Sequence, residues 1–189
     1  MMIYSIIKNT AVIFFTILLQ QTNAQFFNDF ETNQLPEWSG ETIEFEVSDG
    51  RLNLRAPNTE GSFIYREIET QDSMEFIIDF ELDFAPSGSN SLTFYLITDD
   101  PENPGDKCYY LTVGESGGDD ALEFHKKDST GDQLLLRLED GSLGSDPASA
   151  QLIIERYNSG KWIFKTSYNS GEPKFEAKYE ETDQLNFTE

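Results

Sequence analysis

Three carboxylates stand at every second position of one short stretch, at Asp79, Glu81 and Asp83. The positions that alternate with them are apolar: Phe76, Ile78, Phe80, Leu82 and Phe84. Because successive side chains of a strand point to opposite sides, residues 74–84 are predicted to form a half-buried β-strand with one apolar and one acidic face. Carboxylates on one strand face can act in acid–base catalysis, bind a cation or form a solvated surface.

A second acidic cluster lies in the loop of residues 99–106. Its candidate cation ligands are Asp99, Asp100, Glu102, Asn103 and Asp106. Ca²⁺ takes about six to eight oxygen ligands from such groups, and extracellular modules meet millimolar Ca²⁺. The spacing differs from the EF-hand pattern, and a solvated acidic loop is the alternative. Ca²⁺ is therefore the one cofactor that the sequence suggests.

A third set of residues could form a ligand-binding face. Its members are Tyr95, Tyr110, His125, Arg137 and Trp162. Alternation assigns each of them to the sheet face opposite the core, because core-type residues adjoin them, namely Phe94, Leu111, Phe124, Leu136 and Ile163. Aromatic rings flanked by hydrogen-bonding groups are typical of sugar-binding clefts. Ordinary packing or surface exposure is the alternative, and for Trp162 a place in the core.

Nucleophilic catalysis has little support in the sequence. His125 and Cys108 are the only histidine and the only cysteine, so a Cys–His pair would need these two side chains to meet. Cys108 lies in an apolar strand pattern and is expected to be buried. One cysteine also leaves the chain without an internal disulfide, so a hydrophobic core must hold the fold together.

The elements that must position these residues are short strands. The predicted strands cover residues 41–47, 51–56, 62–69, 74–84, 91–98, 107–113, 121–126, 133–139, 151–157, 161–167 and 174–179. Asp49-Gly50 between the first two is a strong hairpin signal. Strands at such spacing, separated by turn residues, indicate an all-β fold, an antiparallel two-sheet β-sandwich. Residues 25–189 are predicted to form this one domain.

The N-terminus and the charge indicate where the protein acts. Residues 1–24 hold Lys8, a short apolar run and small residues before Gln25, which is the pattern of a cleaved signal peptide; an uncleaved membrane anchor is the alternative. The formal net charge of −22 disfavours nucleic acid and anionic membranes as partners. We therefore expect a secreted or cell-surface protein that does not insert into the membrane after signal cleavage.

Three segments carry a family resemblance: residues 86–90 (PSGSN), 108–124 and 153–167. Together they resemble the concanavalin A-like jelly roll in its laminin-G-like and laminarinase-like forms. The chain is also similar to N-terminal modules of bacterial secreted proteins that carry lamin-tail domains, so further domains are expected downstream. The resemblance implies a non-catalytic module that binds a polysaccharide or an extracellular protein, helped by Ca²⁺.

The same resemblance offers an enzymatic alternative, a degenerate or atypical laminarinase-like glycoside hydrolase. Glu81 and Asp83 match the nucleophile and its supporting acid in that family's Glu-x-Asp-x-(x)-Glu signature, but Ala85 and Pro86 stand where the acid/base Glu should be. Retaining hydrolysis needs two carboxyl groups about 5–5.5 Å apart. Asp79 precedes Glu81, whereas the acid/base residue of the signature follows it, so Asp79 does not replace the missing residue. We therefore expect that the protein is not an enzyme.

Overall fold

The computed structural model of the 189-residue chain describes residues 30, 34–55, 61–68, 72–104, 106–114, 120–169 and 175–180. The predicted signal peptide of residues 1–24 lies outside these ranges. The chain divides into two compact units, residues 1–68 and 69–189. The single domain expected over residues 25–189 stays a prediction. No helix within the described ranges is long and apolar enough to cross a membrane.

The first unit consists of short elements. They are β1 (Ser39–Gly40), a 3₁₀ turn η1 (Thr42–Glu44), β2 (Phe45–Ser48), β3 (Arg51–Leu54) and β4 (Ile64–Tyr65). β2 and β3 form the hairpin that Asp49-Gly50 predicts. Both turn residues have positive φ, 54° and 69°, as a two-residue hairpin turn requires. The strand predicted over residues 62–69 is reduced to the two residues of β4.

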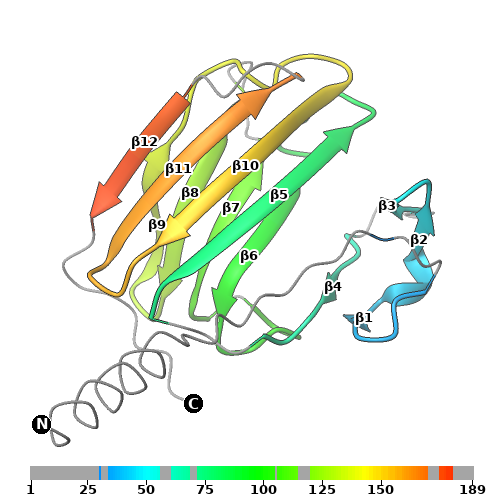
Figure 1. The fold of residues 1–189 in the computed structure, drawn as a ribbon, viewed down its shortest axis with the longest axis horizontal. Helices are drawn as coiled ribbons and strands as arrows, with labels where there is room; N and C mark the ends of the chain where they lie inside the picture. Colours follow the sequence, from blue (N-terminus) through cyan, green and yellow to red (C-terminus); the bar gives the residue numbers. More distant parts are fainter. Residues whose placement is uncertain are drawn as a thin grey trace, which may run out of the picture. The chain divides into compact units, whose positions relative to one another are not determined.

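The second unit contains two antiparallel sheets of four strands each (Figure 1). One sheet has the order β12-β11-β10-β5, and the other has the order β6-β7-β8-β9. The strands are β5 (Met74–Leu82), β6 (Leu92–Thr98), β7 (Cys108–Val113), β8 (Leu122–Asp128), β9 (Gly131–Arg137), β10 (Ala148–Arg156), β11 (Lys161–Tyr168) and β12 (Phe175–Glu180). The predicted fold class, an all-β sandwich of two antiparallel sheets, is confirmed.

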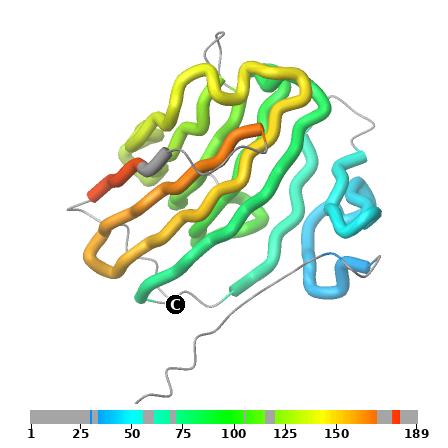
Figure 2. Tube along the Cα trace, turned by 45° about the horizontal axis from the view of Figure 1, so that its top comes forward, coloured from blue at the N-terminus to red at the C-terminus, as the bar shows by residue number. Residues whose placement is uncertain are grey.

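The chain enters one sheet, leaves it and returns. β5 pairs with β10 from Met74–Arg156 to Leu82–Ala148, although β6–β9 intervene in the sequence. Figure 2 shows β5 beside β10, with the meander of β6–β9 forming the other layer. The PSGSN turn between β5 and β6 closes through backbone hydrogen bonds between Ser87 and Asn90. Gly114 at the end of β7 lies against it, where a Cβ would come within 2.7 Å of the Ser87 carbonyl oxygen.

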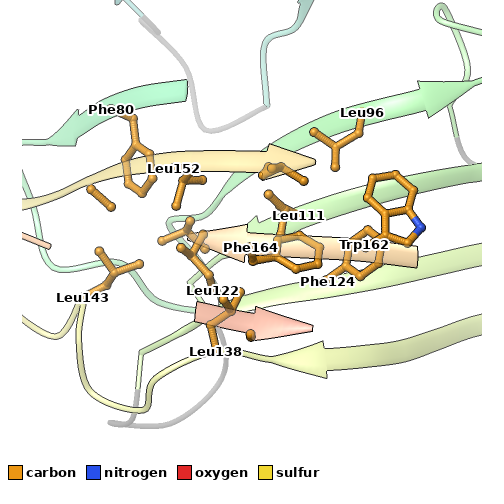
Figure 3. Packing of buried hydrophobic residues seen from close by; sticks show 14 of the residues in the cluster. Phe80, Leu96, Leu111, Leu122, Phe124, Leu138, Leu143, Leu152, Trp162 and Phe164 are labelled. Atoms are coloured by element: carbon orange, nitrogen blue, oxygen red, sulfur yellow. The ribbon is translucent and has the colours of Figure 1, made fainter. Parts of the chain in front are cut away.

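Aromatic side chains form the centre of the core between the two sheets (Figure 3). Phe124 of β8 packs against Trp162 and Phe164 of β11, with ring centroids 4.9 and 4.8 Å apart. The ring centroid of Tyr109 on β7 lies 5.2 Å from that of Trp162. These four side chains are at most 1% exposed, so the two sheets are joined by a dry aromatic contact.

Trp162 therefore corrects one assignment made from the sequence. It belongs to the core and not to the face opposite the core, and Ile163 points the other way. The cause lies in β11, where Trp162, Ile163 and Phe164 are apolar in succession, so alternation alone does not decide which face is buried. The face that buries two large aromatic rings removes more apolar surface from water, so it faces the core.

We expect Phe124→Ala to lower the free energy of unfolding by about 3–5 kcal/mol, because it removes a buried ring and leaves a cavity. Ile77→Ala is the control, since Ile77 is 66% exposed on β5 and its loss should cost less than about 0.5 kcal/mol. Urea unfolding of both variants checks this. Equal losses for the two variants would contradict the assigned core.

Acid should weaken one surface contact. Glu155 accepts hydrogen bonds from Lys165 and, at 2.6 Å, from the Tyr157 hydroxyl, and these contacts lower the pKa of its carboxyl. Because the pKa of this carboxyl is lower in the folded than in the unfolded protein, the contact stabilises the fold above the unfolded pKa. This stabilisation is lost as the pH falls through the folded pKa. Glu155→Gln should therefore cost up to about 1 kcal/mol at neutral pH. The gap to the parent protein should begin to narrow as the pH falls below the ordinary carboxyl value, and it should close below the lowered folded value, in urea titrations at a series of pH values; a gap independent of pH would contradict this.

Candidate ligand-binding face

Four side chains lie in register across the outer surface of the β6–β9 sheet. Tyr95 of β6 is opposite Tyr110 of β7, Tyr110 is opposite His125 of β8, and His125 is opposite Leu134 of β9. Neighbouring strands are about 4.8 Å apart, so the row crosses the sheet over about 14 Å. We call this surface, with the polar side chains around the row, the tyrosine face.

The three rings of the row stack on one another. The centroids of Tyr110 and His125 are 4.9 Å apart with planes 13° from parallel, and those of Tyr95 and Tyr110 are 5.5 Å apart and tilted by 40°. Tyr110 therefore lies between two rings. Tyr95, at the end of the row, is 47% exposed. Leu134, 48% exposed, adds an apolar end on the opposite side of the row.

Asp132, at the start of β9, joins two of these residues. Its Oδ2 accepts a hydrogen bond from the Tyr110 hydroxyl at 2.5 Å, and its Oδ1 lies 3.1 Å from Nδ1 of His125. Burial, and then the hydrogen bond to Asp132, raise the pKa of Tyr110 well above its ordinary value. Tyr110 consequently keeps its proton and acts as a hydrogen-bond donor.

Glu123 and Arg137 continue the network on the other side of His125. Nε2 of His125 lies 3.4 Å from Glu123, and Nη1 of Arg137 donates to the same carboxylate at 2.5 Å. Nε of Arg137 donates to Asp140, also at 2.5 Å. Each ring nitrogen of His125 thus faces a carboxylate, and both contacts are hydrogen bonds when the ring carries both protons.

Cys108 also belongs to this side of the sheet. It precedes Tyr110 by two residues on β7, while Tyr109 between them points into the core. Its side chain is fully buried, as the sequence predicts. Burial raises the pKa of the Cys108 thiol to about 11, although Lys127 opposes the shift. The thiol is therefore neutral at ordinary pH and is a poor nucleophile.

The structure thus brings together four of the five residues predicted for a ligand face, namely Tyr95, Tyr110, His125 and Arg137. It adds Asp132, Glu123 and Asp140, which the sequence analysis did not select. Glu123 could have been found, because it stands two residues before His125 on the same strand. Asp132 could not, because the register of β8 and β9 shifts between Phe124 and His125. Alternation counted from Leu136 and Arg137 therefore assigns Asp132 to the wrong face.

The predicted cation ligands lie in the loop after β6, where Asp100 forms local contacts with the backbone. Oδ1 of Asp100 accepts backbone hydrogen bonds from Glu102 and Asn103 at 3.0 and 3.1 Å, which is a local turn. Asp99 and Asp106 are exposed. In the described ranges, no three His, Cys, Asp or Glu side chains form a group that could hold a metal ion. Binding of Ca²⁺ here stays a prediction.

The acidic strand that suggested catalysis lies elsewhere. Asp79 and Glu81 of β5, and Asp83 just after it, are exposed, while Phe80 and Leu82 are buried. These carboxylates lie on the outer surface of the β12-β11-β10-β5 sheet, so the core separates them from the tyrosine face. They therefore cannot act on the same bound ligand as His125 and Asp132.

Fold and face together define the class: a β-sandwich with an aromatic and acidic outer surface on one sheet. Comparisons of the chain with protein-family models, with curated proteins and with solved structures gave no match.

The neutral, buried thiol can be tested directly, because Cys108 is the only cysteine of the chain. At pH 8 the folded protein should react with a chromogenic aromatic disulfide at least about 100-fold more slowly than the urea-unfolded protein, because a thiol pKa of about 11 leaves very little thiolate. Lys127→Met keeps the aliphatic stem and removes the charge, so its thiol should react more slowly still. Equal rates in folded and unfolded protein would contradict the burial.

Proposed function

We propose that this protein is a secreted, non-catalytic binding module and that the tyrosine face binds a sugar chain. The observation that carries the proposal is the open ring of Tyr95 beside a network of carboxylates. Tyr95 is 47% exposed, and its neighbour Tyr110 is held in place by stacking and by Asp132. An apolar ring next to fixed polar groups suits a sugar, which has apolar C–H faces and hydroxyl edges.

A binding role is also supported by how the polar groups of the face are used. Tyr110 holds its proton in a short hydrogen bond, and His125 lies between two carboxylates. Arg137 is paired with Glu123 and Asp140. Groups fixed in mutual contacts are preorganised to orient a ligand. The neutral thiol of Cys108 adds no nucleophile to this face.

The proposal includes several features that come from the sequence. They are export through the signal peptide of residues 1–24, membership of the concanavalin A-like jelly rolls, further domains after residue 189, and assistance by Ca²⁺ bound at Asp99, Asp100, Glu102, Asn103 and Asp106. An extracellular protein is the alternative ligand. The charge of −22 supports partners that are neither nucleic acid nor anionic membrane.

Sugar binding can be tested on an array of immobilised neutral, acidic and amino oligosaccharides. At least one class should retain the protein, and Tyr95→Ala should weaken that binding about 3- to 10-fold through loss of ring stacking. Tyr157→Ala is the matched control, because Tyr157 is 38% exposed and directly follows β10, a strand of the other sheet.

Two outcomes would contradict the proposal. One is retention by no sugar, or equal losses for Tyr95→Ala and Tyr157→Ala. The other is release of reducing ends from β-glucan that Glu81→Gln abolishes, because that result would assign hydrolysis to the acidic strand.

A further inference from the structure

The hydrogen-bond donors of the tyrosine face are largely used within the protein. Tyr110 donates its hydroxyl proton to Asp132. Arg137 directs Nη1 to Glu123 and Nε to Asp140. Apart from the Tyr95 hydroxyl and the Lys127 ammonium, what these residues offer to a ligand is carboxylate oxygen, which only accepts hydrogen bonds. A ligand that binds here must therefore bring its own donors.

Charge favours a cationic donor over a neutral one. Two cations lie among these residues: Arg137, which is shared between two carboxylates, and Lys127, which stands opposite Cys108 on β7 and opposite Asp132 on β9. The oxygens of Asp132 contact Tyr110 and His125, neither of them a permanent cation, and the Asp132 side chain is 47% exposed. An accessible carboxylate in a chain of net charge −22 attracts positive groups and repels negative ones.

Tyr95 supplies a second feature that a cation would use. Its exposed side chain lies on the same face as Asp132, because the Tyr95 ring packs against Tyr110 and the Tyr110 hydroxyl donates to Asp132. The face of a tyrosine ring carries negative charge density and attracts an ammonium group. A ligand that covers Tyr110 would therefore meet the Tyr95 ring on one side and the oxygens of Asp132 on the other.

We propose that the tyrosine face prefers sugars that carry a free amine, of the glucosamine type, over neutral or acidic sugars of equal length. This preference rests on the proposed sugar binding. It narrows the ligand to a class that satisfies both the acceptor-rich surface and the open ring. N-acetylation of the amine would remove the positive charge and so the advantage.

Calorimetric titration of the full chain with matched hexamers tests the preference. The probes are a glucosamine hexamer, its fully N-acetylated counterpart and a galacturonate hexamer, in mildly acidic buffer that keeps the amine protonated. The glucosamine hexamer should bind at least about 5-fold more tightly than the acetylated one. Asp132→Asn should remove that advantage, whereas Asp79→Asn, which deletes an exposed carboxylate on the other side of the sandwich, should keep it. Should Asp132→Asn fail to fold, Asp140→Asn in the same cluster replaces it.

The outcomes separate the two proposals. Equal or tighter binding of the acetylated or galacturonate hexamer overturns the amine preference and leaves sugar binding intact. If hexalysine binds as tightly as the glucosamine hexamer, or if the Asp132 and Asp79 variants lose equal affinity, the preference is overturned. Either result indicates a general attraction of cations to an acidic protein. Binding of no hexamer overturns sugar binding itself and the preference with it.

Discussion

The packing of Phe124 against Trp162 and Phe164 determines how β8 lies, and β8 carries much of the candidate site. Because side chains alternate along a strand, burying Phe124 turns Glu123 and His125 to the outer surface. The ladder then sets Tyr110 beside His125. The dry contact between the sheets is thus the reason that a histidine, a tyrosine and a carboxylate meet on the opposite side.

On that outer surface, ion pairs and hydrogen bonds fix the side chains that the strand register brings together. Asp132 comes from the start of β9 and ties Tyr110 to His125, while Arg137 near the end of the same strand holds Glu123. Tyr110, His125 and Arg137 each contact at least one carboxylate, and these contacts offset part of the cost of desolvating them. The result is a surface whose groups are oriented before any ligand arrives.

The faces of most strands could be predicted because each has a clear two-residue alternation. Tyr95, Tyr110 and His125 were assigned correctly for that reason. Trp162 was not, because three successive residues of β11 are apolar, so a pattern of alternating apolar and polar residues could not show which face is buried. Asp132 was missed because its approach to Tyr110 depends on a register shift in β8–β9, which is a property of the paired strands and not of either sequence alone.

β5 has a partner, β10, on one side only within the described ranges, so it is an edge strand of its sheet. Edge strands offer unpaired backbone groups to other chains, and proteins commonly prevent such pairing with charge. If two copies paired along this edge, Asp79, Glu81 and Asp83 would bring like charges side by side across the new ladder. The row that first resembled catalytic machinery thus has a physical consequence that needs no ligand: its charge disfavours extension of the sheet into a neighbour.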